Sequence, residues 1–153
     1  IQLNNNIETI ALEMLYEKQY ILDEILSCTI NTTFYDNQED NYEKYINLME
    51  TRKLYFDKIK SIDKELNDVK FKNIFLNGSQ NFLADVNGIK SSFSIISKKI
   101  IDIDKQNQEV INKIMAYIKS EMKDVKDYKK VSVIYNDNSD LIYNAGYYFD
   151  KTN

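Results

Sequence analysis

The sequence predicts an all-α protein: an elongated antiparallel bundle of three to four coiled-coil-like helices, with one long C-terminal helix and an aromatic tail. The chain has 153 residues but no proline and only three glycines, so the residues that usually mark turns are almost absent. Hydrophobic residues make up 43% of the chain and recur at three- and four-residue intervals over long stretches. The length fits a single helical domain spanning residues 1–153.

The first helix is predicted at about residues 6–30. One apolar stripe consists of Leu3, Ile7, Ile10, Met14, Ile21, Ile25 and Cys28. A parallel stripe of Ala11, Leu15, Leu22 and Leu26 widens this face, so the helix must be covered on more than one side. Residues 31–35 are polar, β-branched or aromatic and favour a connection.

The second helix is predicted at about residues 37–70. Asp36 and Glu39 have the spacing of a capping box at its start. Its apolar stripe is interrupted by Arg52 and otherwise consists of Tyr42, Tyr45, Met49, Phe56, Ile59 and Leu66. The Asn-Gly-Ser sequence at residues 77–79 is the clearest turn signal in the chain and separates this helix from the next.

A long third helix is predicted at about residues 80–132, because apolar residues keep a helical period from Phe82 to Val125. Gly88 is the expected site of a break or kink in it. Residues 133–153 form a polar tail rich in aromatic residues: Tyr135, Tyr143, Tyr147, Tyr148 and Phe149. Such a tail cannot bury a core of its own, so it either folds back on the helices or waits for a partner.

The composition removes most catalytic chemistry. Without histidine the chain cannot form a Ser-His-Asp or Cys-His pair or an HExxH zinc site. The single cysteine, Cys28, excludes an internal disulfide and a Cys-rich zinc site, and it fits a reducing compartment. No stretch approaches the ~18 apolar residues of a membrane span. We therefore expect a cytoplasmic protein that is not an enzyme, uses no cofactor or metal and does not insert into a membrane.

Calcium and nucleic-acid binding are also disfavoured. Residues 36–40 resemble the start of a calcium loop, but Asn41 and Asn47 stand where that loop needs glycine and a chelating glutamate. A lysine face near the end of the long helix consists of Lys119, Lys123, Lys126 and Lys130. Acidic residues interleave with these lysines and the net charge is -4, so the electrostatic footprint of a nucleic-acid-binding protein is missing.

Arg52 and Asn107 are polar residues at otherwise apolar positions of their helix stripes. Such residues set register and partner number in coiled coils. Alternatively, one or both orient a bound partner helix through a buried hydrogen bond. The sequence leaves both interpretations open. Asp102 and Asp104 are two residues apart on one helix, point in different directions and are expected to be solvated.

Several stretches resemble a known family. They are Leu-Tyr-Glu-Lys-Gln-Tyr-Ile-Leu-Asp-Glu-Ile-Leu at 15–26, Leu-Met-Glu-Thr-Arg-Lys at 48–53, Ile-Lys-Ser-Ile-Asp-Lys-Glu-Leu at 59–66, Ile-Asp-Lys-Gln-Asn at 103–107 and Tyr-Tyr-Phe-Asp-Lys at 147–151. Together they resemble flagellar export chaperones of the FlgN and FliT type, in the low-GC Gram-positive, clostridial branch. The resemblance implies a small cytosolic chaperone that holds a hook-associated or filament-cap protein and delivers it to the type III export apparatus. It implies no catalysis.

The apolar faces agree with such a role through the helix-in-groove mode, in which a partner helix buries side chains at i, i+3, i+4 and i+7. The expected wall of the groove, on the distal half of the long helix, consists of Val110, Ile114, Ile118, Met122 and Val125. The tail aromatics are candidates to occupy the same groove when no client is bound. The alternative function is a structural, self-associating coiled-coil or adaptor protein that forms a homodimer through the same stripes.

Overall fold

The computed structural model describes residues 2–35, 40–121, 129 and 132–138, and it confirms the predicted all-α bundle. The helices are α1 (Gln2–Asn31), α2 (Asn41–Leu66), α3 (Val69–Asn77), α4 (Gln80–Gln106) and α5 (Gln108–Glu121). Residues 132–138 are also helical. The predicted capping box lies outside the described residues.

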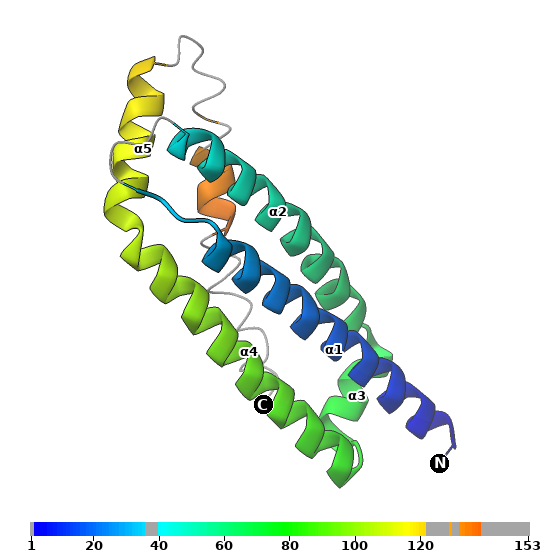
Figure 1. The fold of residues 1–153 in the computed structure, drawn as a ribbon. Helices are drawn as coiled ribbons and strands as arrows, with labels where there is room; N and C mark the ends of the chain where they lie inside the picture. Colours follow the sequence, from blue (N-terminus) through cyan, green and yellow to red (C-terminus); the bar gives the residue numbers. More distant parts are fainter. Residues whose placement is uncertain (1, 36–39, 122–128, 130–131, 139–153) are drawn as a thin grey trace.

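The three longest helices lie lengthwise beside one another and give the molecule its elongated shape (Figure 1). α1 and α4 run in the same direction, and α2 runs opposite to both. α1 is the central element, because it packs against α2, α3 and α4, whereas α5 packs against α2 and the end of α4. The wide apolar face predicted for the first helix is therefore covered by several neighbours.

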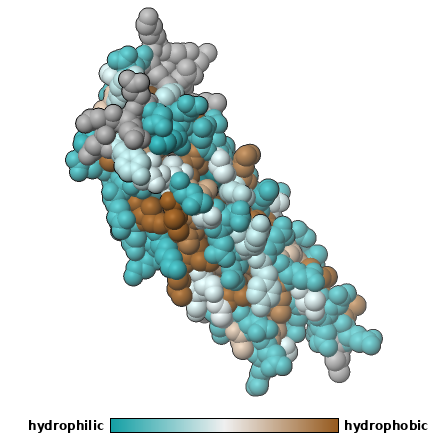
Figure 2. Space-filling view, viewed as in Figure 1, coloured by the Kyte–Doolittle hydropathy of each residue, from teal (hydrophilic) through white to brown (hydrophobic). Residues whose placement is uncertain are grey.

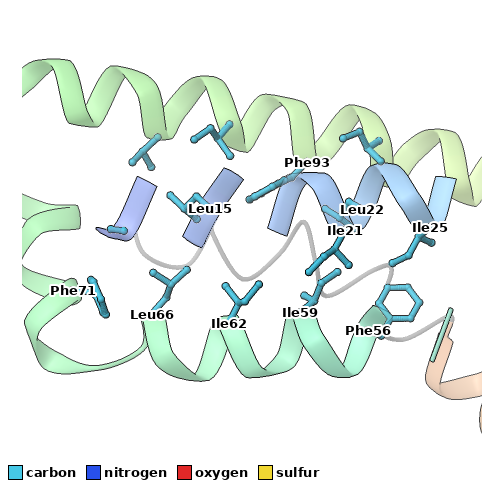
Figure 3. Packing of buried hydrophobic residues seen from close by; sticks show 14 of the residues in the cluster. Leu15, Ile21, Leu22, Ile25, Phe56, Ile59, Ile62, Leu66, Phe71 and Phe93 are labelled. Atoms are coloured by element: carbon cyan, nitrogen blue, oxygen red, sulfur yellow. The ribbon is translucent and has the colours of Figure 1, made fainter. Parts of the chain in front are cut away.

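The main core lies among α1, α2, α3 and α4, and Figure 3 shows its side chains pointing into the space between these helices. Its buried residues follow the predicted stripes: Ala11, Leu15, Ile21, Leu22 and Ile25 on α1; Phe56, Ile59, Ile62 and Leu66 on α2; Phe71 and Ile74 on α3; and Phe82, Val86, Ile89, Phe93, Ile96 and Ile100 on α4. Removing these side chains from water is the main contribution to the stability of the bundle.

The second helix ends at Leu66, four residues before the predicted end at residue 70, and α3 follows as a separate helix. The interruption has a local cause. Asp68 takes an extended conformation and its side chain accepts a hydrogen bond from the backbone N–H of Lys70. This N-cap satisfies a donor at the start of α3, so the chain changes direction and places Phe71 in the core.

The predicted turn at residues 77–79 lies where expected, between α3 and α4. Ser79 caps α4 by accepting a hydrogen bond from the backbone N–H of Phe82. The carboxylate of Glu8 accepts two further bonds, from the Ser79 N–H at 2.7 Å and from its hydroxyl at 2.9 Å. A Cβ at Gly78 would lie 2.5 Å from the carbonyl oxygen of Ile74, so glycine is required at this turn.

The predicted 80–132 helix is interrupted at Asn107, which separates α4 from α5. No break occurs at Gly88, because α4 continues through this residue, where the surroundings are open. At Asn107 the backbone N–H bonds to the carbonyls of both Ile103 and Lys105, which tightens the last turn of α4. The predicted end at residue 132 cannot be followed, since residues 122–128, 130 and 131 lie outside the described ranges.

The surface facing the viewer in Figure 2 is mostly hydrophilic, with hydrophobic surface gathered where α1 and α4 lie side by side. Large apolar side chains such as Leu54 on α2 and Ile95 on α4 are also exposed. Exposed apolar residues of this kind are normal on a folded protein.

Candidate partner-binding site between α2 and α5

A second hydrophobic cluster lies at the end of the bundle formed by α5 and the first half of α2. Its buried residues are Phe34 in the connection after α1; Tyr45, Leu48 and Met49 on α2; Ile111, Ile114 and Ile118 on α5; and Ile134. We call the surface formed by these α2 and α5 residues the α2–α5 site. It is separate from the main core, although both clusters share α2.

The structure corrects the expectation of an open groove wall on the long helix. Ile114 and Ile118 are buried within the α2–α5 site, and Val110 is half-buried at its edge. Two further predicted wall residues, Met122 and Val125, lie outside the described residues. The helical spacing located an apolar face correctly, and the tail was expected as a candidate to occupy it, but the spacing could not show that α2 also covers that face.

The cover over the site is the short segment 132–138, which lies between α2 and α5 (Figure 1). Ile134 is buried in the cluster. The ring of Tyr135 lies 6.2 Å from the ring of Tyr45, and its hydroxyl donates a hydrogen bond to Oε1 of Gln108 at 3.1 Å. A part of the predicted aromatic tail therefore folds back on the bundle.

The contact between cover and site is incompletely hydrogen-bonded. The side-chain amide of Asn138, 2% exposed, donates to the carbonyl oxygens of Ile134 at 2.9 Å and Met49 at 3.5 Å. Within the described ranges, its Oδ1 has no hydrogen-bond partner, and neither does the buried hydroxyl of Tyr45. Burial raises the pKa of Tyr45, so this hydroxyl stays protonated. Unpaired buried polar atoms destabilise the closed arrangement.

Arg52 is buried between the two clusters and forms a bidentate ion pair with Asp104 of α4. Its Nη1 and Nη2 each lie 3.0 Å from a carboxylate oxygen. Asp104, expected to be solvated, is thus ion-paired and only partly exposed. The sequence marked Arg52 as a polar residue in an apolar stripe but gave no sign of its partner, which is 52 residues away. The pair fixes the end of α4 against α2, next to the break at Asn107.

Asn107 lies at the helix break rather than inside a continuous core stripe, and its side chain is half-buried. The break between α4 and α5 comes three residues after Asp104. The Arg52–Asp104 ion pair therefore holds the end of α4, from which α5 continues, against α2. The proposed role of Asn107 in setting helix register or orienting a partner stays a prediction.

A second buried ion pair joins α1 to α2 through Lys18. Its Nζ lies 2.8 Å from Oδ1 of Asp63 and 5.1 Å from the ring centroid of Phe93. Burial lowers the pKa of Lys18 and raises the pKa of Asp63, while the attraction between the two charges opposes both shifts. The pair lies inside the main core and belongs to the scaffold.

Cys28 lies at the edge of the α2–α5 cluster and lines a pocket of about 490 Å³ together with Thr33, Lys44 and Leu48. Its thiol donates a hydrogen bond to the carbonyl oxygen of Ile25 at 3.1 Å. Burial raises the pKa of this thiol, so the reactive thiolate is a minor form at neutral pH. The environment is that of a packing cysteine.

No protein-family model, curated protein or solved structure matches this chain. Among the described residues, no group of three or more His, Cys, Asp or Glu side chains is placed to hold a metal ion. No helix in the described ranges has the length and apolarity needed to cross a membrane. The candidate site is therefore judged by its own chemistry, which is apolar packing with a few directed hydrogen bonds.

Proposed function

We propose that this protein is a cytoplasmic chaperone that binds a late flagellar type III export substrate, a hook-associated or filament-cap protein, and delivers it for export. The observation that carries the proposal is the α2–α5 site, an apolar surface on two helices covered by a short segment of the same chain. The stretches that resemble FlgN- and FliT-type chaperones support the choice of client.

The cover is suited to exchange with a partner. The described contacts of residues 132–138 with the site are the buried Ile134, the Tyr135–Tyr45 ring pair and side-chain hydrogen bonds to Gln108 and to the Met49 carbonyl. The seat of the cover leaves Asn138 Oδ1 and the Tyr45 hydroxyl without a hydrogen-bond partner among the described residues. A client helix with an apolar face would bury the same site.

Binding is tested by isothermal titration calorimetry of the full chain with purified hook-associated and filament-cap proteins. Replacing Ile134 by Asp loosens the cover without changing α2 or α5. Burying an isoleucine contributes about 1.5–3 kcal/mol, so the apparent client affinity should rise about tenfold or more. The matched control is Val133→Asp, an exposed position of the same segment, which should leave the affinity unchanged.

A second pair of variants tests the site itself. Val110→Glu places a charge at the half-buried edge of the α2–α5 site and should weaken client binding, whereas Tyr117→Glu, at an exposed position of α5, should not. Failure of the folded wild-type chain to bind any of these clients would overturn the proposal. If the chain instead forms a dimer that dissociates on dilution, the self-associating structural function is favoured.

A further inference from the structure

Residues 132–138 occupy the α2–α5 site in the way a ligand would, so their contacts show what the site recognises. We infer that this site selects a helical partner segment carrying an aliphatic side chain, an aromatic side chain next to it and a carboxamide one turn after the aliphatic residue. In this chain the three positions are Ile134, Tyr135 and Asn138. The inference rests on the proposed partner-binding function and deepens it.

The aliphatic position is defined by the three isoleucines of α5. Ile134 is 7% exposed and lies in one cluster with Ile111, Ile114 and Ile118. These α5 residues are three, four and seven positions apart and so share one helix face. A β-branched or similarly compact aliphatic side chain fits among them, and a charged one would be desolvated without a partner.

The aromatic position is defined by a set of rings and one hydrogen bond. Tyr45, fully buried on α2, lies 6.4 Å from Phe34 and 6.2 Å from Tyr135, with the ring planes tilted in both pairs. The Tyr135 hydroxyl donates to Gln108 at the start of α5. The apolar body of a tyrosine thus packs on the rings while its polar end reaches a specific acceptor.

The carboxamide position adds directional selection. Asn138 and Ile134 are four residues apart and lie on the same side of the segment. The Asn138 amide donates across to the carbonyl oxygen of Met49 on α2 and back to Ile134. A leucine here would lose the bond across to α2, and an aspartate would also bury a charge.

The chain's own segment satisfies this pattern incompletely, because Asn138 Oδ1 and the Tyr45 hydroxyl have no hydrogen-bond partner in the part of the chain that the structure describes. A partner helix with the same three side chains, able to pair these two atoms as well, would bind more tightly than the cover. The site therefore discriminates by hydrogen bonding as well as by apolar area, because a partner lacking the carboxamide leaves buried groups unpaired.

The test uses the full-length Ile134→Asp variant and a fluorescently labelled peptide with the sequence of residues 129–140, followed by fluorescence anisotropy. The peptide should bind this variant, and should bind the wild-type chain at least tenfold more weakly because the wild-type cover competes. Peptides with Asn138→Leu or Tyr135→Ala should lose tenfold or more in affinity. A peptide with Val133→Ala, changed at an exposed position, is the matched control.

Equal affinity of the Asn138→Leu and unchanged peptides would overturn the inference, as would a peptide that fails to bind a variant that retains helical circular dichroism. Client binding is measured in parallel, so that a failure of the recognition pattern is distinguished from a failure of the proposed function. If the client binds and the peptide does not, the recognition pattern is wrong and the chaperone role stands. If the peptide binds with the expected pattern and no client does, the pattern stands and the client assignment fails.

Discussion

The Arg52–Asp104 ion pair makes an asymmetric prediction about stability. The Arg52 side chain is 1% exposed and the Asp104 side chain is 29% exposed. Replacing Asp104 by Ala leaves a guanidinium buried without its partner, and breaking a buried pair in this way costs about 3 kcal/mol of unfolding free energy. Replacing Arg52 by Met keeps most of the buried volume and leaves a carboxylate that water can reach, so we expect a cost of about 1 kcal/mol.

Urea unfolding followed by far-UV circular dichroism measures the difference. With a slope of about 2 kcal/mol per molar urea, Asp104→Ala should lower the midpoint by about 1.5 M and Arg52→Met by about 0.5 M. Asp102→Ala, an exposed neighbour on α4, is the matched control and should change the unfolding free energy by less than about 0.5 kcal/mol. If Arg52→Met costs as much as Asp104→Ala, burial of the unpaired charge does not dominate and the reasoning is refuted.

Three further predictions concern the scaffold. The double variant Lys18→Met/Asp63→Leu should be as stable as the wild type at pH 7 or more stable by about 1 kcal/mol, because a buried ion pair barely repays its desolvation. The pKa of Asp63 is raised in the folded state, so the unfolding free energy of the wild type should rise relative to that of the double variant as the pH falls from neutral toward about 4. The difference in unfolding free energy between the two proteins, measured by urea titration, should therefore narrow, and a widening difference would contradict the pKa direction. Gly78→Ala should lower the unfolding free energy by about 2 kcal/mol, because its Cβ would crowd a backbone oxygen, whereas Gly88→Ala should raise it by about 0.5 kcal/mol; the same sign for both would contradict the local geometry. A thiol reagent at neutral pH should label Cys28 at least tenfold more slowly in the folded chain than in urea, and equal rates would show that the thiol is not protected.

The sequence was sufficient for the helices because the pattern of apolar residues is a local property. The stripe through Leu15 and Leu22 lies in the main core, and the Asn-Gly-Ser turn lies between two helices as predicted. The break at Asn107 was missed because an asparagine in an apolar stripe indicates only a polar position. The backbone conformation of Asn107 depends on where α5 packs against α2.

The tertiary partners could not be predicted for a related reason. The pairing of Arg52 with Asp104, and of Lys18 with Asp63, joins residues on different helices, and their spacing in the sequence carries no information about rotation or register. The same holds for the α2–α5 site. The face that includes Ile114 and Ile118 was found by periodicity and the tail was named as a candidate to occupy it, but the part that α2 takes in covering it became visible only in three dimensions.

Hydrogen exchange measured by mass spectrometry, on the full chain alone and with a bound hook-associated or filament-cap protein, tests partner binding at the α2–α5 site most directly. Our account predicts slower exchange in α5 and faster exchange in residues 132–138 on binding, because the client takes the place of the cover. Slower exchange confined to α1 and α4, with α5 and the cover unchanged, would contradict it.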